Sequence, residues 1–336
     1  MDSVLEELSL VCLRCRAKDG IAVQPHALLA ACDEGSHLVC RRCSTRFPVV
    51  DGVAVLRENQ GAAYELGGVD DVQWPPDIQA WCERMAKLDP NCAEFVATTL
   101  LGTYGLAHYP TVDCHILESG IALLQQAISE LLTGVDVPEG ATLELGCGPA
   151  GMVPTWSEFS SGPHVLLDGR LGQLRMGQRL ASGKDFPLPR RRTGMAFSPF
   201  TLKARPADAP VLFCCADALN PPFLPSSFAM VAALNLLDSV PEPWVLLGQI
   251  SALLRPGGVA VIALPYHYEN QPPDPANWIH GPQALRNILS GQMTGLDQLQ
   301  FEIIGEVDGV SWPLRAHDRL LHLYSVHLVV VRKGLQ

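Results

Sequence analysis

Residues 141–152 read ATLELGCGPAGM, and this stretch determines the fold class. An apolar run ends at Glu144 and leads directly into a glycine-rich turn. The glycines of this turn are Gly146, Gly148 and Gly151. Glycine lets the backbone turn sharply and lets a ligand approach it closely. Asp168 ends a second apolar run, HVLLD, where an acid can bind the hydroxyls of a ribose. The pattern predicts a nucleotide-type site at the first turn of an α/β sheet.

Apolar runs continue to alternate with helical segments after this turn, which is typical of a parallel sheet. Beyond the first two strands, we expect strands in APVLFCCAD, FAMVAALNLL and GVAVIALPY, and a helix in VPEPWVLLGQISALL. Two last strands, LQFEIIGEVDG and YSVHLVVVRK, have only a loop between them, so they are predicted to form an antiparallel hairpin. We therefore expect seven strands with the last one antiparallel. The three glycines also satisfy the dinucleotide fingerprint Gly-x-Gly-x-x-Gly, but dinucleotide dehydrogenases end differently.

Composition narrows the class of protein. The 336 residues are 48% hydrophobic, which suffices for one large domain and a small one. A formal net charge of −11 argues against nucleic acid as a partner. The run Arg190 to Arg192 lies in a Pro-rich stretch, and we expect it in a solvated loop. The chain shows neither a basic leader nor 18 consecutive apolar residues, and its eleven cysteines fit a reducing compartment. We expect a cytoplasmic protein without a membrane span.

Four cysteines near the start have the spacing of a metal site. They form the pairs Cys12-x-x-Cys15 and Cys40-x-x-Cys43, separated by 24 residues. Four thiolates make a closed, tetrahedral, structural zinc site. Cys32 and His37 lie between the pairs and are alternative ligands. We expect residues 1–57 to form a separate zinc-binding unit, whose loss would spare the nucleotide-type site.

The rest of the chain divides into three parts. Residues 58–73 are polar and Gly-rich and read as a linker, and residues 74–133 read as a mostly helical cap. Residues 134–336 form the predicted α/β domain. Within it, residues 181–210 hold several prolines and show little periodicity, so we expect either a lid over the site or a simple excursion.

The α/β part resembles the class I S-adenosylmethionine (SAM) methyltransferases. The wording Glu-Leu-Gly-Cys-Gly matches the first motif of that family, and LLRPGGVAVIALP matches the segment before its fifth strand. The resemblance implies a Rossmann-like fold and SAM as cofactor. It implies SAM-binding roles for Glu144, Gly146, Gly148, Gly151, Asp168, Asp217, Ala218, Asn235 and Leu236. The aromatic residues Tyr104 and Tyr109, which we expect between two cap helices, could cover the methionine end of SAM.

Two further resemblances involve the N-terminal segment and several later pieces of the chain. The run STRFPVVDGVAVL after Cys43 resembles the strand end of Trm112-type zinc ribbons, which accompany methyltransferases as a separate partner or fused to them. Several pieces, among them TYGLAHYP and ALPYHYE, resemble the N-methyltransferase domain of ovothiol biosynthesis. That similarity implies a small polar, amino-acid-like substrate with a nitrogen or sulfur nucleophile.

Substrate contacts are expected from the segment after the fifth strand and from the last hairpin. The catalytic candidates are Tyr266, His267 and Tyr268, of which His267 is the favoured proton acceptor. Arg315 and Arg319 would bind a substrate carboxylate, provided that their turn is helical. The alternatives are an rRNA or tRNA methyltransferase, and a non-catalytic SAM-binding partner module. A homodimer, or a protein partner bound through the zinc ribbon, is also compatible with the sequence.

Overall fold

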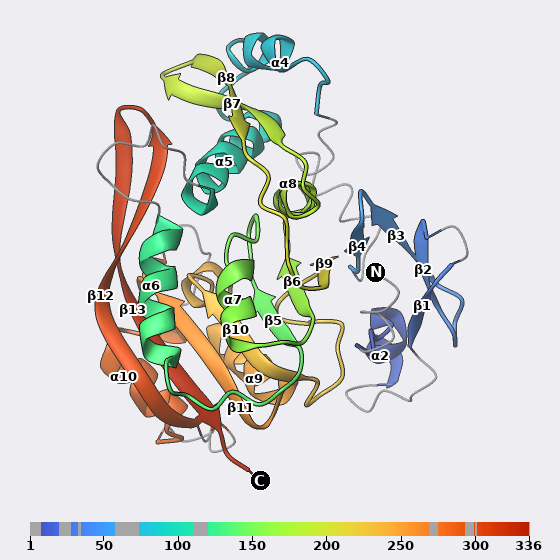
Figure 1. Ribbon diagram of the computed structural model, residues 1–336, viewed down its shortest axis with the longest axis vertical. Coiled ribbons are helices and arrows are strands. Elements are labelled where there is room, and N and C mark those ends of the chain that lie inside the picture. Colours follow the sequence, from blue (N-terminus) through green and yellow to red (C-terminus); the bar gives the residue numbers. More distant parts are fainter. Residues whose placement is uncertain are drawn as a thin grey trace.

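The computed structural model describes residues 8–19, 28–32, 35–57, 74–109, 120–268, 275–292, 299 and 301–335. Its centre is an 11-stranded sheet in the order β1-β2-β3-β4-β9-β6-β5-β10-β11-β13-β12 (Figure 1). These strands are β1 (Leu29–Ala31), β2 (His37–Cys40), β3 (Arg46–Val50), β4 (Val53–Val55), β5 (Thr142–Leu145), β6 (His164–Asp168), β9 (Val211–Cys215), β10 (Phe228–Leu234), β11 (Leu254–Leu264), β12 (Phe301–His317) and β13 (Leu320–Lys333). The predicted linker, residues 58–73, lies outside the described residues.

Seven strands form the α/β sheet that the sequence predicts. Strands β9, β6, β5, β10 and β11 pair in parallel, whereas β13 pairs antiparallel with both β11 and β12. Each central strand is an almost uninterrupted apolar run, because helices cover both faces of a parallel sheet. The expected sheet, including its antiparallel last strand, is confirmed.

Helices cover the two faces of this sheet. On one face lie α6 (Gly120–Leu132), α7 (Val153–Phe159) and α8 (Leu171–Ala181), and on the other α9 (Pro243–Leu253) and α10 (Pro282–Leu289). Two short 3-10 helices, Leu237–Ser239 and Pro275–Asn277, follow β10 and precede α10. The carboxyl ends of the parallel strands remain open between these layers, which is where open α/β sheets bind ligands.

The predicted helical cap contains α4 (Ile78–Met85) and α5 (Ala93–His108) in addition to α6. Asp77 caps α4, since its carboxylate accepts the backbone N–H of Gln79. The expectation that Tyr104 lies between two helices is wrong, because α5 continues through it to His108. Its apolar residues recur at helical spacing without interruption, so the helix continues where the local sequence suggested a break.

The N-terminal segment is joined to the main sheet instead of standing apart from it. Strand β4 pairs in parallel with β9, and the N–H of Leu56 donates to the carbonyl of Cys215 over 2.8 Å. Buried side chains of the segment, such as Leu10 and Phe47, belong to the same hydrophobic core as strands β5 and β6. The expectation of a separate unit is therefore not met, because the segment completes one edge of the sheet.

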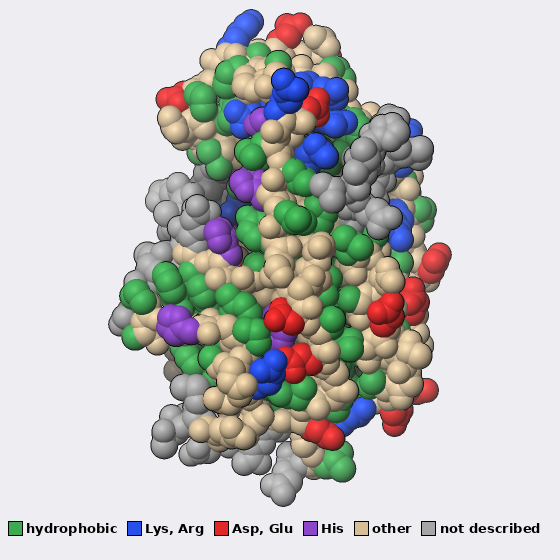
Figure 2. All heavy atoms as spheres, turned by 90° about the vertical axis from the view of Figure 1, so that its left-hand side faces the viewer, with side chains coloured by type: hydrophobic (Ala, Val, Ile, Leu, Met, Phe, Trp, Pro, Cys, Tyr) green, Lys and Arg blue, Asp and Glu red, His purple; other side chains and the backbone are tan. Residues whose placement is uncertain are grey.

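The stretch 181–210 forms a hairpin, although its prolines suggested an irregular loop. Strands β7 (Phe186–Thr193) and β8 (Ala196–Leu202) pair antiparallel and pack their apolar side chains on α4 and α5. The expected arginine loop is thus wrong: Arg190 to Arg192 lie on β7. Arg190 and Arg192 form ion pairs with Asp318 at 2.9 and 2.8 Å. Figure 2 shows Lys and Arg side chains gathered at this end of the molecule.

The last hairpin is longer than the sequence indicated, with 17 residues in β12 and 14 in β13. Both strands extend beyond the central strands of the sheet, and β12 contacts α5 and β7 (Figure 1). Arg315 lies on β12, and Arg319 lies in the turn between the two strands. The turn is therefore not helical, although the expected binding of a carboxylate by Arg315 and Arg319 required a helical turn.

Candidate active site

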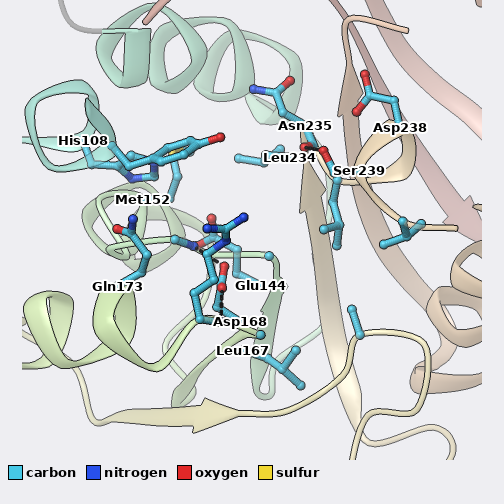
Figure 3. A pocket seen from close by; sticks show the side chains of 18 of the residues that line it. His108, Glu144, Met152, Leu167, Asp168, Gln173, Leu234, Asn235, Asp238 and Ser239 are labelled. Atoms are coloured by element: carbon cyan, nitrogen blue, oxygen red, sulfur yellow. Dashed lines mark hydrogen bonds between the residues drawn. The ribbon is translucent and has the colours of Figure 1, made fainter. Parts of the chain in front are cut away.

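A cavity of about 440 Å³ lies at the carboxyl ends of the parallel strands. Residues from the glycine-rich turn, α5, α6, α8, the ends of β6, β9, β10 and β11, and the last hairpin line its wall. Figure 3 shows Glu144 and Asp168 on one side of it, and Asn235, Asp238 and Ser239 on the other. Of the sequence-predicted residues, the cavity brings together Tyr104, Glu144, Gly146, Gly148, Asp168, Asp217, Ala218, Asn235, Leu236 and His267.

The glycine-rich turn and Asp168 form one hydrogen-bonded unit. Gly146 and Gly148 have φ values of +71° and +52°, a left-handed conformation that side chains rarely adopt. The N–H of Gly148 donates to one Asp168 carboxylate oxygen over 2.9 Å, and the N–H of Arg170 donates to the other over 2.7 Å. These bonds hold the carboxylate at the end of β6, facing the cavity.

Glu144 is a buried acid in the wall of the cavity, only 2% exposed. Burial raises its pKa to about 8, although the indole N–H of Trp156, which donates to it over 2.8 Å, opposes the shift. The side chain is therefore largely protonated at neutral pH. A cation placed beside it would favour the ionised form.

Asp217 lies at the same side of the cavity, two residues after the end of β9. Its carboxylate accepts the N–H of Leu219 over 2.9 Å, which closes a tight turn. Ala218 is part of the wall beside it. This turn lies next to Asp168, because the N–H of Ala216 donates to the Asp168 carbonyl over 3.1 Å.

Two predicted cofactor residues do not line the cavity. A Cβ atom at Gly151 would lie 2.8 Å from the Cβ of His108, and the Gly151 N–H donates to the ring of His108 over 3.1 Å. The hydroxyl of Tyr109 donates to the carbonyl of Pro149 over 2.8 Å, beneath the turn. Gly151 and Tyr109 thus support the turn through α5 instead of facing a ligand. Burial lowers the pKa of His108 to about 3, so its ring is neutral and accepts the Gly151 N–H.

The opposite side of the cavity is polar and strained. Asn235 ends β10 with a φ of +52°, and Leu236 fills the space over Gly146. The amide oxygen of Asn235 is buried and has no hydrogen-bond partner among the described residues. Such a group is costly unless a ligand supplies a donor. Asp238 is 3% exposed, and burial raises its pKa.

Of the three aromatic residues after β11, His267 alone lines the cavity. Its backbone N–H donates to Asp238 over 2.7 Å, and its ring lies 5.3 Å from that of Tyr324. Tyr266, with a φ of +58°, turns away and shares a 2.6 Å hydrogen bond with the ring of His327. Tyr268 stacks on Trp278 at 4.7 Å. The geometry thus places Tyr266 and Tyr268 outside the wall.

Tyr266 is the first member of a chain of polar side chains. His327 is 1% exposed, and its second ring nitrogen lies 2.6 Å from a carboxylate oxygen of Glu306. Arg286 holds that carboxylate at 2.8 Å, and this pairing lowers the pKa of Glu306. The chain links β12 and β13 to the segment that carries His267.

Several wall residues escaped sequence reasoning. Trp312 and Tyr324 face each other across β12 and β13, and with Tyr104 they make one side of the cavity aromatic. Gln173 joins them from α8. We expected Trp312 in the loop between the two last strands; the available signal was the alternation of Val310, Trp312 and Leu314 with other residues, which continues the strand. Its place in the cavity wall depends on the register of the hairpin, which is not a local property.

Arg315 and Arg319 do not line this cavity, so the described geometry does not support the expected carboxylate contact there. Arg315 borders a separate small hollow beside Arg190 and Arg191. Because β12 is a strand, residues 314 and 315 point to opposite faces, and Leu314 takes the face toward the cavity.

The four N-terminal cysteines meet at one point. Their sulfur atoms all lie within 4.8 Å of one another, with Cys12 and Cys43 at 3.7 Å and Cys15 and Cys40 at 3.8 Å. A tetrahedral zinc ion with Zn–S bonds of about 2.3 Å separates its sulfurs by about 3.8 Å. The four thiols therefore fit a structural zinc ion. Cys32 and His37 are not part of this cluster of described residues.

Comparison with known proteins identifies a methyltransferase domain within the α/β sheet. Residues 143–262 match the family profile described as a methyltransferase domain. No curated protein matches the chain. Among solved structures, the [4+2]-cyclase SpnF shares 15% identity over 72% of this chain and 94% of its own, with a TM-score of 0.45. A SAM-dependent methyltransferase from Leishmania major shares 10% over 76% and 91%, with a TM-score of 0.43.

A third similar structure is the complex between the Haloferax volcanii Trm112 methyltransferase activator and a methyltransferase. It shares 13% identity over 64% of this chain and 93% of the other, with a TM-score of 0.40. None of these similarities is close enough to transfer a substrate to this chain.

The family match identifies a methyltransferase domain, and the sheet order and the glycine-rich turn agree with a SAM-dependent enzyme of that kind. The segment that carries this identity is the methyltransferase domain of residues 143–262. The chain is thus an enzyme of the methyltransferase class that uses SAM.

Proposed function

We propose that the protein methylates a nitrogen atom of a small polar, amino-acid-like metabolite. The observation that carries this proposal is the buried amide oxygen of Asn235, which lacks a partner among the described residues. A substrate N–H would satisfy this acceptor, whereas a thiol is a weak donor. The aromatic wall of Tyr104, Trp312 and Tyr324 suits a flat or partly apolar group beside it.

SAM fits the Asp168 side of the cavity in this proposal. Asp168 would accept the ribose hydroxyls, and the turn at Asp217 and Ala218 would contact the adenine. Glu144 would stabilise the ammonium group. When bound, SAM supplies an activated methyl group for an in-line displacement.

The residues across the cavity would prepare the nucleophile. The amide oxygen of Asn235 would accept the N–H of the substrate nitrogen and so orient that nitrogen, which is a positioning effect. His267 would accept the proton that the nitrogen loses, since its ring borders the cavity near Tyr324. The carboxylate of Asp238 would hold the His267 segment by accepting the backbone N–H of His267.

A structural zinc ion at the four cysteines is part of the proposal. Four thiolates would leave no position open for water, so this zinc would stabilise the fold without chemistry of its own. None of the ten described cysteines is in a disulfide, which supports the expected cytoplasmic location. Among the described residues, we find no helix that is both apolar and long enough for a bilayer.

The test is a methylation assay with labelled SAM and a panel of amino-acid-derived imidazoles, amines and thiols, alongside total RNA. We expect label in an imidazole or amine. Asn235→Ala should reduce turnover at least tenfold and leave the affinity for S-adenosylhomocysteine unchanged, with Ser239→Ala as the control on the same wall. Label in RNA alone would overturn the small-molecule proposal, and label in thiols alone would overturn the role of Asn235.

Asp168→Ala tests the cofactor side independently. Loss of a charged hydrogen-bond acceptor should weaken S-adenosylhomocysteine binding by ~1–3 kcal/mol, as measured by calorimetry. Unchanged affinity would contradict the ribose contact.

A further inference from the structure

The N-terminal segment, which carries the four cysteines and is called the zinc ribbon below, makes a second contact with the methyltransferase domain, beyond the pairing of β4 with β9. Helix α2 (Leu13–Asp19) carries Arg16, whose guanidinium donates to three acceptors. These acceptors are the side-chain oxygen of Asn220 at 3.3 Å, the carbonyl of Pro221, and the carbonyl of Phe223 at 2.8 Å. The N–H of Val11 also donates to the carbonyl of Pro222 over 2.9 Å.

The contacted segment, residues 220–223, directly follows the turn that borders the cavity. The N–H of Asn220 donates to the carbonyl of Asp217 over 3.1 Å, so the two parts form one continuous loop. On the other side of Asp217, Leu56 holds the carbonyl of Cys215 at the end of β9. The N-terminal segment therefore fixes the chain both before and after Asp217.

Arg16 is itself held by the cysteine cluster. It follows Cys15, and the N–H groups of Cys15 and Arg16 both donate to the carbonyl of Cys12, at 3.1 and 3.0 Å. A metal ion bound by Cys12 and Cys15 would fix this first turn of α2. The guanidinium would then have one position from which its planar fork reaches several carbonyl oxygens.

We propose that Arg16 is a positioning residue for the cofactor, and that the zinc ribbon holds the 217–223 loop in its binding conformation. This inference rests on the proposed zinc site and on the proposed contact of Asp217 and Ala218 with adenine. It predicts that the ribbon controls cofactor affinity from outside the cavity, since Arg16 does not line the cavity. The ribbon and the cofactor site are then not independent, contrary to the expectation from the sequence.

The experiment compares Arg16→Ala, Arg16→Lys and the control Arg14→Ala in the full chain. Arg14 lies on the same helix but is exposed. S-adenosylhomocysteine and 5′-methylthioadenosine serve as probes, because both carry adenosine and the second lacks the amino acid. Zinc content is measured for each variant, and hydrogen exchange is followed for the amides of residues 217–223.

We expect Arg16→Ala to keep its zinc, to bind both probes at least fivefold more weakly, and to lose exchange protection in the 217–223 loop. Arg16→Lys should restore little, since an ammonium group lacks the planar fork. Arg14→Ala should behave as the wild type. Unchanged affinity together with unchanged protection in Arg16→Ala would overturn the proposal, as would equal losses in Arg14→Ala.

The failure of the proposed function would look different. If all metabolites in the panel stay unlabelled while Arg16→Ala still loosens the loop and weakens both probes, the substrate assignment fails and the positioning role stands. If the variant also loses zinc, a second measurement decides: wild-type protein stripped of zinc by a chelator should show the same weaker binding. Stripped protein that binds both probes as the zinc-loaded protein does would overturn the coupling.

Discussion

The two edges of the sheet are completed in different ways. At the β9 edge, short strands from a small segment are added, and four cysteines of that segment meet at one point. At the β11 edge, a single long hairpin, β12–β13, is added without any metal-binding cluster among its described residues. Short strands bury little surface, so we expect the first edge to depend on the proposed zinc ion and the second on the length of its strands.

This difference separates the two halves of the site. The first edge contacts the loop beside Asp217, on the side assigned to the cofactor. The second edge supplies Trp312 and Tyr324, on the side assigned to the substrate. We therefore expect damage to the first edge to alter cofactor affinity, and damage to the second to alter turnover.

The largest effect is expected from removing one thiol of the four-cysteine cluster. Cys40→Ser removes one thiolate, and structural zinc contributes on the order of 10 kcal/mol to the folding of small domains. The variant should lose its zinc and bind S-adenosylhomocysteine at least tenfold more weakly, as elemental analysis and calorimetry would show. Cys32→Ser, in the same segment but outside the cluster, is the control. A zinc-free variant with normal affinity would contradict the role assigned to this edge.

The middle of the sheet, between the two edges, should carry a pH dependence of stability. Because burial raises the pKa of Glu144 to about 8, the folded protein keeps a proton that the unfolded chain releases near its ordinary value of 4.5. The contribution of Glu144 is thus fully present below pH 4.5 and is lost as pH rises to about 8. Between these two pH values, the free energy of unfolding should fall by about 1.4 kcal/mol for each pH unit.

Glu144→Gln removes this titration. Urea unfolding of both proteins between pH 5 and 8 measures the difference, which should shrink the pH dependence in the variant. If the free energies of unfolding of the two proteins changed with pH in parallel, Glu144 would ionise normally in the folded protein.

A moderate effect is expected at the hairpin edge. Glu306→Ala leaves the buried ring of His327 without its carboxylate partner, which should cost ~1–3 kcal/mol of stability. Turnover should fall because Tyr266, and with it the His267 segment, loses its support, while cofactor affinity stays within twofold. Glu302→Ala, an exposed position on the same strand, is the control. A loss of affinity equal to the loss of turnover would remove the proposed separation of the two edges.

The smallest effect is expected from the ion pairs between the hairpins. Asp318 pairs with Arg190 and Arg192, and these groups are partly exposed. Asp318→Asn should cost at most about 1 kcal/mol, and the cost should fall with added salt. Thermal unfolding at low and high salt measures it. A larger cost that salt does not change would mean that the tips of the two hairpins form one packed unit.

The sequence predicted the parts of the molecule that depend on local pattern. Apolar runs marked the seven strands, and the glycines with Asp168 marked the cavity. The pairing of Val53–Val55 with β9 was missed, because it joins residues about 160 positions apart and no local signal encodes it. Hairpin β7–β8 was missed because proline normally argues against a strand. Here Pro189 pairs opposite Pro199 in a two-stranded sheet, where both strands are edges.

The parallel pairing of β4 with β9 also has a consequence for assembly. The strand that completes this edge belongs to the same chain, so its effective concentration is fixed by the covalent connection and not by how much protein is present. Dilution cannot remove it, and no second chain is needed in equal amount to complete the edge. The hydrogen-bonding positions of β9 that β4 occupies are also closed to a strand from another molecule.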